Sequence, residues 1–541
     1  MVHHFTFGVT VAFTLNYIIG TGFLTLPWAF QQTGCLLGIA ILVVMTLFSM
    51  ISACLIVENM ARAALLSSSL AKNEDVEDVA VNADSSRYQS VTTFPFHDDG
   101  GIELKSPIRL PEDDNDDDDD IDDIIIAAQK VKNSNNNEFH DVDKVIVGEH
   151  KYEFGDLCEI FLGKQGRYAY TATICIYLYG TLWAYATVFS KAMTTHLNIG
   201  KYSYGLYLLL YAFLVVPPSL LELSEQIVVQ VILSFCRIMM LLLMVVTILN
   251  AYVYSDVNSF NGFDHKSMME EEDVYSINVH KLYILLPIAA FANIFHHSIP
   301  GLSEPVLDKK SLSKAFCLAL LISCVGYAAI GVVISIYFGS YTMVASNLNW
   351  SEYIGTSTSH SYQLLASIVS FYIVLFPAFD VASVFPLCAI TLGNSMYSAY
   401  NSSKDSASLV NCKNSDEDFT LLAQTSSNSN SNSNQINESR QKLKYFRLLA
   451  SVPPIICAYF MSNLGQITDF TGITGFFIAF IFPAILSRAS ISKLTKLNLP
   501  TRTYYTTHFT SNYMINLTLL FGIGLTLYVL ISFIAFGPPN E

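Results

Sequence analysis

The sequence predicts an all-α polytopic membrane protein with about eleven transmembrane helices. Of its 541 residues, 52% are hydrophobic but only 14% are charged, and the mean hydropathy is +0.41. Soluble domains carry about a quarter charged residues, so the shortage of charge is the informative part of this composition. Apolar segments of about 20 residues, long enough to cross a bilayer core, recur along the chain. Segments of about ten residues with alternating polarity, typical of membrane barrels, are absent from the sequence.

The predicted spans are helices because a helix satisfies its own backbone hydrogen bonds in lipid. The first apolar segment, Phe5 to Trp28, is too long for the core of a signal peptide and lacks a preceding basic region, so we expect it to remain as the first span. The spans are placed at residues 5–31, 36–62, 166–193, 204–221, 226–253, 282–302, 314–338, 362–393, 445–462, 466–487 and 512–536.

Two long polar segments divide this membrane part. Residues 71–150 hold 22 acidic against 7 basic residues, which accounts for −15 of the net charge of −16, so the acidity belongs to a loop and does not describe the substrate. The loops 67–150 and 395–441 contain too few apolar residues to form a core and are predicted to be disordered. The membrane blocks around them are 1–66 with spans 1–2, 151–394 with spans 3–8, and 442–541 with spans 9–11.

Basic residues near the spans predict the orientation. The positive-inside rule places the N-terminus and both long loops in the cytosol, and the C-terminus in a lumen or outside the cell. The opposite side has Lys201, Lys266 and little else. The residues assigned to the cytosolic side are Arg62, Lys309, Lys310, Lys314, Lys442, Lys444, Arg447, Arg488, Lys493, Lys496 and Arg502.

Two short motifs concern processing and location. Asn349 begins an N-glycosylation sequon that this topology places on the lumenal side. Glu417, Leu421 and Leu422 match the acidic dileucine pattern that endosomal and lysosomal sorting adaptors bind, although an accidental match in disordered sequence is the alternative. The predicted location is therefore an endosomal, lysosomal or plasma membrane.

The first span contains a predicted helix break at Gly20-Thr21-Gly22. Glycine costs about 1 kcal/mol in a helix interior, and Pro27 follows within two turns. Freed backbone groups at membrane depth are tolerated only against protein or a water-filled cavity. The half-helix after the break would direct N–H groups and the positive end of its dipole at a carboxylate, with Ile19, Gly20, Thr21 and Gly22 as candidate binding residues. A glycine face used only for helix packing is the alternative.

The sixth span has a second polar interruption. Its centre holds Asn293, His296, His297 and Ser298, and Pro300-Gly301 follow. Spans one and six occupy corresponding positions in two five-helix halves, and paired interruptions of this kind indicate an inverted-repeat transporter with its site near the membrane midplane. The pairing favours a binding site over simple packing, although it depends on positions alone because the halves share no obvious residue-level repeat.

Ionisable residues inside spans are functional candidates. His297 is a candidate proton-responsive group, with a structural histidine as the alternative. A metal shared with His296 is not expected, because neighbours on a helix point about 100° apart. In span eight, Asp380 and Ser383 could form a cation site with Asn16; alternatively, Asp380 pairs with a basic group or lies near a helix end.

Span three contains one more candidate residue, and the cysteines suggest no special site. Tyr179 is a candidate cavity residue because it neighbours Gly180, where helices can approach closely. The ten cysteines show neither metal spacing nor a disulfide framework. The sequence also lacks a phosphate-binding P-loop, which argues against an ATP-driven pump.

Several of these segments together resemble a known family. NYIIGTGFLTLPWAF is similar to the first-helix signature of the amino acid/auxin permeases, the eleven-helix branch of the amino acid–polyamine–cation superfamily. The resemblance is closer to the transmembrane protein 104 family, and it extends over the membrane part nearly end to end. The further segments that carry it are IYLYG, FHHSIPGLSEPV, LFPAFDVASVFPLCAITL and TGITG at 471–475.

The resemblance implies a five-plus-five inverted-repeat fold and cation-coupled movement of amino acids. The substrate carboxylate would then meet the backbone at Gly20, Thr21 and Gly22, and Ser383 would match a hydroxyl near a sodium-type site. Asp380 departs from the uncharged residue expected there, which leaves sodium against proton coupling open.

The predicted function is secondary active transport of an amino acid or similar small solute by alternating access. The expected partners are this solute, a coupled proton or sodium ion and the lipid bilayer; enzyme activity, cofactors, bound metal and nucleic acid are not expected. The alternative is a membrane amino acid sensor that signals through its cytosolic loops.

Overall fold

The computed structural model describes residues 5–89, 145–147, 152–197, 199–220, 227–254, 259–260, 277–356, 359–412 and 429–537. These residues form helices, and their only β-type pairings are two isolated bridges. Among them, eight helices are long and apolar enough to cross a membrane, or nine when a bent pair counts as one span. The predicted all-α membrane fold is confirmed, whereas the count of eleven spans and the inverted repeat stay predictions.

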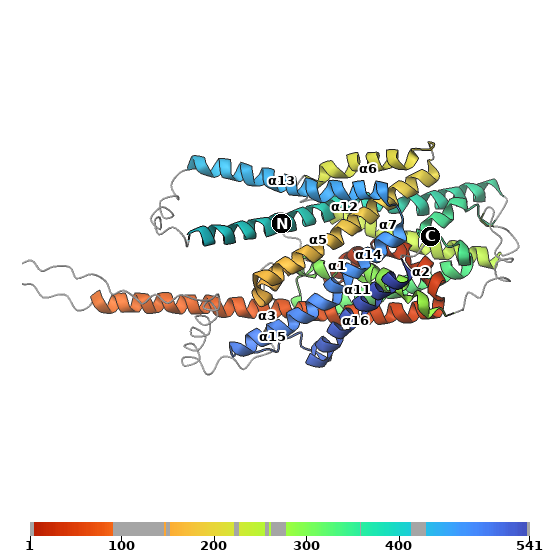
Figure 1. Cartoon of the computed structure of the whole chain (residues 1–541). Coiled ribbons are helices and arrows are strands. Elements are labelled where there is room, and N and C mark those ends of the chain that lie inside the picture. Colours follow the sequence, from red (N-terminus) through yellow and green to blue (C-terminus); the bar gives the residue numbers. More distant parts are fainter. Residues whose placement is uncertain are drawn as a thin grey trace, which may run out of the picture.

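The helices lie together as one elongated bundle (Figure 1). In chain order, the α-helices are α1 (Phe7–Ile18), α2 (Leu26–Thr33), α3 (Cys35–Gln89), α5 (Phe154–His196), α6 (Ser203–Ser219), α7 (Ile227–Val253), α9 (Leu282–Asn293), α10 (Ile299–Ser303), α11 (Leu312–Phe338), α12 (His360–Cys412), α13 (Ser429–Phe460), α14 (Leu464–Phe476), α15 (Phe482–Lys496) and α16 (Asn512–Phe536). Short 3-10 segments include η1 (Gly22–Leu24), η4 (His296–Ser298) and η7 (Ser346–Glu352), and the π-helical η9 (Phe477–Ile481) joins α14 to α15.

Three helices continue past the predicted loop boundaries. α3 and α12 run on beyond residues 66 and 394, and α13 begins before residue 442. The physical reason is that residues 67–89, 395–412 and 429–441 contain no glycine or proline that would end a helix. The places where these helices leave the membrane stay a prediction. Figure 1 shows α12 and α13 extending side by side past the bundle. The central parts of both loops lie outside the described residues, as do Glu417, Leu421 and Leu422.

Glycines bring α14 into backbone contact with its neighbours. A Cβ added at Gly472 would collide with the Pro287 carbonyl of α9, and one added at Gly180 of α5 would collide with the Thr471 hydroxyl. A Cβ at Gly475 would likewise collide with Ile294. The glycines of the TGITG segment therefore let α9 lie directly against α14, and the close approach predicted at Gly180 is present.

Basic residues assigned to the cytosolic side hold the turns at one end of the bundle. The Arg62 guanidinium lies 2.8 Å from the Glu58 carboxylate, and its Nε donates to the Thr501 carbonyl at 3.1 Å. The Tyr505 hydroxyl donates to the Lys309 carbonyl at 2.9 Å. These contacts bring segments from three parts of the chain together, whereas the side of the membrane that they face stays a prediction.

The predicted glycosylation site is buried in this conformation. Asn349 lies in η7, where its amide nitrogen donates to the Tyr341 carbonyl at 2.9 Å. Its amide oxygen accepts from the Met343 N–H at 3.0 Å. The side chain therefore stabilises its own loop in this conformation, and its glycosylation stays a prediction.

Candidate functional site

The first span is broken where the glycines predict a break. α1 ends at Ile18, and the helical pair on either side of the break is bent by 61°. At the break, the Gly20 N–H donates to the Ile18 carbonyl at 2.8 Å. The chain then continues through η1, which begins at Gly22, into α2.

A second break lies in the sixth predicted span. α9 ends at Asn293, and Ile294 and Phe295 leave the helical conformation before η4 and the short α10. The two breaks meet, because a Cβ added at Gly22 would lie only 2.7 Å from the Ala292 Cα. Gly22 therefore has the packing role that the sequence left as an alternative.

Gly20 has different surroundings from Gly22. The nearest atom to a Cβ added at Gly20 is the Tyr185 hydroxyl oxygen of α5, 3.8 Å away. A Cβ at Gly20 would therefore make an ordinary van der Waals contact, whereas one at Gly22 would collide with α9. Gly20, next to Tyr185, is the less tightly packed of the two glycines.

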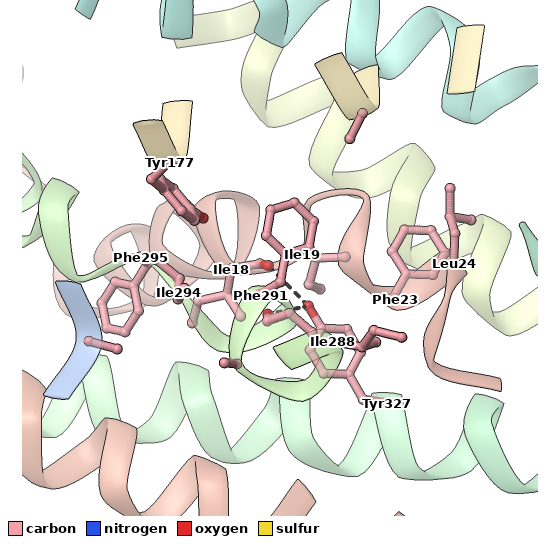
Figure 2. Close-up of a cluster of buried hydrophobic side chains, with 14 of the residues drawn as sticks. Ile18, Ile19, Phe23, Leu24, Tyr177, Ile288, Phe291, Ile294, Phe295 and Tyr327 are labelled. Carbon is pink, nitrogen blue, oxygen red and sulfur yellow. Dashed lines mark hydrogen bonds between the residues drawn. The ribbon is translucent and has the colours of Figure 1, made fainter. Parts of the chain in front are cut away.

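Tyr327 of α11 joins the two breaks. Its hydroxyl lies 3.0 Å from the Ile18 carbonyl and 3.2 Å from the Ala292 carbonyl, and the side chain is buried. Figure 2 shows this hydroxyl between the two broken helices, surrounded by apolar side chains such as Ile288 and Phe291. Backbone groups freed at membrane depth need a partner, and Tyr327 supplies one for both helices. Sequence reasoning missed this residue, because a tyrosine in an apolar span carries no signal of its own.

The polar residues of the second break point in two directions. Asn293 donates to the Ala289 carbonyl at 2.9 Å and lies 3.4 Å from the Thr46 hydroxyl of α3. His296 is fully buried, and its Nε2 lies 3.2 Å from the Ser49 carbonyl, also on α3. Both side chains thus contact α3 in this conformation, and their predicted role in binding substrate stays a prediction.

His297 and Ser298, in contrast, line a cavity of about 420 Å³ beside the first half of the first broken helix. Pockets for small molecules range from about 300 to 1,000 Å³, so this cavity can hold a ligand the size of an amino acid. Its other walls come from α1, α5 and α12, and include Phe13, Tyr17, Arg167, Tyr170, Thr391 and Asn394.

Tyr177 of span three lies closer to the breaks than Tyr179 does. The Tyr179 hydroxyl donates to the Leu449 carbonyl of α13 at 2.6 Å, which directs it away from the breaks. The ring of Tyr177 lies 5.6 Å from that of His297 and 6.1 Å from that of Phe291. On a helix, residues two positions apart point to different faces, so Tyr179 does not share the surroundings of Tyr177, and its role in a substrate cavity stays a prediction.

Asp380 forms a buried ion pair with Arg237 of α7. Arg237 Nη2 lies 2.6 Å from one carboxylate oxygen and Nε lies 3.0 Å from the other, which is a bidentate arrangement. The second guanidinium nitrogen, Nη1, donates to the Asn16 backbone carbonyl at 2.7 Å and to its side-chain oxygen at 2.6 Å. Arg237 is 2% exposed and Asp380 is 6% exposed.

This pair changes the predicted cation site. The oxygens of Asn16 and Asp380 do lie close together, but the group between them is the Arg237 guanidinium and not a metal cation. This matches the alternative prediction, in which Asp380 pairs with a basic residue. Ser383 does not join them, because its hydroxyl donates to the Asp380 backbone carbonyl at 2.8 Å within the same helix. In the described part of the chain, no group of three or more His, Cys, Asp or Glu side chains could hold a metal ion. Arg237 was missed although a lone charge in the apolar run VILSFCRIMMLLLM is itself a functional signal.

Comparison with known proteins identifies relatives that are similar to this chain along most of its length. The chain is similar to the "Transmembrane protein 104 homolog" of Dictyostelium discoideum, with 23% identity over 499 residues that cover 88% of this chain and 86% of the relative. It is also similar to human "Transmembrane protein 104", with 22% identity over 509 residues that cover 88% and 86% of the two chains. The resemblance to this family noted from the motifs is thereby confirmed.

Solved structures are more distant. The manganese transporter of Eremococcus coleocola, solved in complex with an aromatic bis-isothiourea substituted compound, has 12% sequence identity and a TM-score of 0.44 over 99% of this chain and 88% of that chain. A likeness of this size identifies neither a substrate nor a mechanism.

A family match covers most of the chain. The family described as "Transmembrane amino acid transporter protein" matches residues 3–75 and 139–532, so the match includes both breaks, Arg237, Asp380 and the cavity residues, and omits most of the acidic segment. The chain therefore belongs to the transmembrane amino acid transporter protein family.

Proposed function

We propose that this protein is a secondary active transporter that moves an amino acid, or a similar small solute, across a membrane by alternating access. The observation that carries the proposal is the meeting of two interrupted helices at Gly22 and Ala292. Gly20, the less tightly packed glycine of the first break, lies next to this contact. Family membership supports transport in general, and the breaks indicate where the solute binds.

The groups at the first break suit a carboxylate. The N–H groups of Thr21, Gly22 and Phe23 begin the second half of the broken helix, so they have no acceptor within that half. The positive end of the helix dipole lies at the same place. The Thr21 hydroxyl is buried and has no hydrogen-bond partner in the structure. A ligand carboxylate placed above Gly20 would meet these donors.

The route to this site is the cavity at His297 and Ser298. The Tyr177 ring lies 5.6 Å from that of His297, which lines the cavity. Figure 2 shows Tyr177 together with the apolar side chains around the first break, such as Ile18 and Ile19. Apolar and aromatic groups therefore dominate the space next to the carboxylate donors. This arrangement favours an amino acid with an uncharged side chain.

Uptake into liposomes tests the proposal. Purified protein is reconstituted and given labelled amino acids one at a time, at pH 5 and pH 7. We expect saturable uptake of at least one amino acid, and we expect Gly20→Val to reduce it at least tenfold by filling the space beneath Tyr185. Gly8→Val is the matched control on the same helix, because a Cβ at Gly8 meets nothing within 4 Å. Failure of every amino acid to enter above protein-free liposomes, with folded protein, would reject the proposal.

We further propose that sodium does not drive this transport. A guanidinium already occupies the place between Asn16 and Asp380 where an oxygen-coordinated cation would bind. Replacing sodium with choline on both sides of the liposome membrane should therefore leave uptake unchanged within about twofold. A loss of tenfold or more on sodium removal would show that a sodium site exists elsewhere.

A further inference from the structure

A second intramembrane carboxylate, Asp469 on α14, has no partner. The residue is 1% exposed, and neither carboxylate oxygen has a hydrogen-bond partner in the structure. No ion pair of the described residues includes it, unlike Asp380, whose two oxygens both receive guanidinium hydrogen bonds.

The helices packed against α14 bring no cation to this carboxylate. On α9, Tyr283 lies within electrostatic range of Asp469 and of Tyr528 on α16. Just before α9, Lys281 is engaged elsewhere, because its amine donates to the Gln32 side chain at 2.5 Å. α5 meets the other face of α14 at Thr471, and its tyrosines there lie near His297 and Gly20. The π-helical segment FIAFI that follows α14 carries no titratable side chain.

A carboxylate in these surroundings must be neutral. An ionised carboxylate removed from water without a compensating partner costs several kcal/mol, and such a group takes up a proton instead. The Asp469 side chain therefore holds a proton in this conformation, and it can lose that proton only when water reaches it.

Asp469 lies where a helix movement would admit water. It precedes Gly472 by about one turn, and Gly472 packs directly on the Pro287 carbonyl. Pro287 has no N–H, so the Tyr283 carbonyl one turn earlier receives no helical hydrogen bond from it. The carboxyl group thus adjoins a weakened turn in the first half of the second broken helix.

We propose that Asp469 is the proton-binding site that couples a proton gradient to movement of the second broken helix. Water delivers a proton to the carboxylate oxygen while the contact between α9 and α14 is open, and the neutral acid allows this contact to close. Reopening lets the proton return to water, on the other side of the membrane once the cavity has changed its access. This inference rests on the proposed transport function and identifies its driving ion.

Accumulation against a pH gradient tests the site. One proton per solute and one pH unit support accumulation of up to about tenfold. In liposomes with that gradient, using the amino acid found in the uptake assay, wild-type protein should accumulate the label severalfold. Asp469→Asn should exchange label across the membrane without accumulating it, because the amide resembles the neutral acid and does not titrate. Accumulation by Asp469→Asn equal to that of wild type would overturn the inference.

Two further variants serve as controls for this experiment. Thr468→Val is the matched control, since this buried neighbour bonds only to carbonyls of its own helix and does not titrate, and it should retain accumulation. Asp469→Glu keeps a titrating group and should retain a pH dependence with a shifted midpoint. If Asp469→Asn does not fold, a pH dependence unchanged in Asp469→Glu would count against the site.

A measurement without solute separates this inference from the transport proposal. The infrared spectrum of the purified protein at neutral pH should contain a carboxylic acid band that Asp469→Asn loses and Thr468→Val keeps. If the band behaves in this way but no amino acid is transported, the proton site stands and the proposed function fails. If amino acids are transported but Asp469→Asn leaves the band intact, the inference fails and the proposed function stands.

Discussion

Arg237 and Asp380 place two opposite charges inside an apolar bundle. Taking both charges out of water is costly, and their attraction offsets that cost only with close geometry and further hydrogen bonds. Here the fork of Arg237 supplies the geometry, and Asn16 takes the remaining donor. The three residues come from α7, α12 and α1, so one guanidinium joins three helices.

This arrangement predicts the behaviour of single and double substitutions. Arg237→Met and Asp380→Leu should each lower stability by about 3–5 kcal/mol, because each leaves an unpaired buried charge. The double variant should recover most of that loss, since it removes both charges. Thermal unfolding of the purified variants, followed by tryptophan fluorescence, measures the effect. Ser383→Ala is the control, and strictly additive losses in the double variant would contradict the pairing.

The two interrupted helices are held together by contacts of their backbones. Gly22 lets η1 approach Ala292 of α9, and Tyr327 reaches a carbonyl in the last turn before each break, that of Ile18 and that of Ala292. The breaks are therefore tightly packed at Gly22 and less tightly packed at Gly20. Packing, one of the two alternatives that the sequence offered for the whole GTG segment, is the role of Gly22, and the proposed ligand binding is placed at Gly20.

The difference between the two glycines can be tested directly. Gly22→Ala places a methyl group 2.7 Å from the Ala292 Cα and should lower stability by about 1–3 kcal/mol, the usual cost of overpacking. Gly20→Ala, with its nearest neighbour at 3.8 Å, should fold like the wild type. Yield of monodisperse protein and the unfolding temperature report both effects. Equal losses of stability in the two variants would show that Gly22 is not more tightly packed than Gly20.

On the scale of the whole molecule, the cavity beside the two breaks is the feature that bears on the proposed transport cycle. The cavity reaches from the outer residues of α12 and α5 to His297 at the second break. A ligand that reaches the break through this cavity would contact these residues. A bound ligand should therefore reduce the access of other reagents to the cavity wall.

Thiol labelling tests this access. Thr391→Cys on the cavity wall should react with a membrane-impermeant maleimide, and saturating amounts of the transported amino acid should slow the reaction severalfold. Thr495→Cys, on the exposed side of α15 away from the cavity, should react without such slowing. Equal protection of both positions would indicate an effect of the amino acid on the whole protein rather than on the cavity.

The sequence predicted where the helices break, but it did not predict which side chains contact one another. Gly20, Gly22 and the polar run after Asn293 predicted both interruptions, because backbone irregularity inside a span requires special residues. Helix facing could not be predicted, so Tyr179 was preferred to Tyr177 and His296 was assigned to the site although it contacts α3. Arg237 was overlooked because its role depends on two helices far away in the chain.

The hydroxyl of Tyr327 has one hydrogen and lies within reach of two acceptors, the carbonyls of Ile18 and Ala292. It can make one strong bond at a time or share the hydrogen weakly between both. If either half-helix withdraws, the hydrogen passes wholly to the other carbonyl, and the phenol never loses its partner. Separation of the broken helices then costs less than a full hydrogen bond, which suits a contact that would open and close in each cycle of the proposed transport.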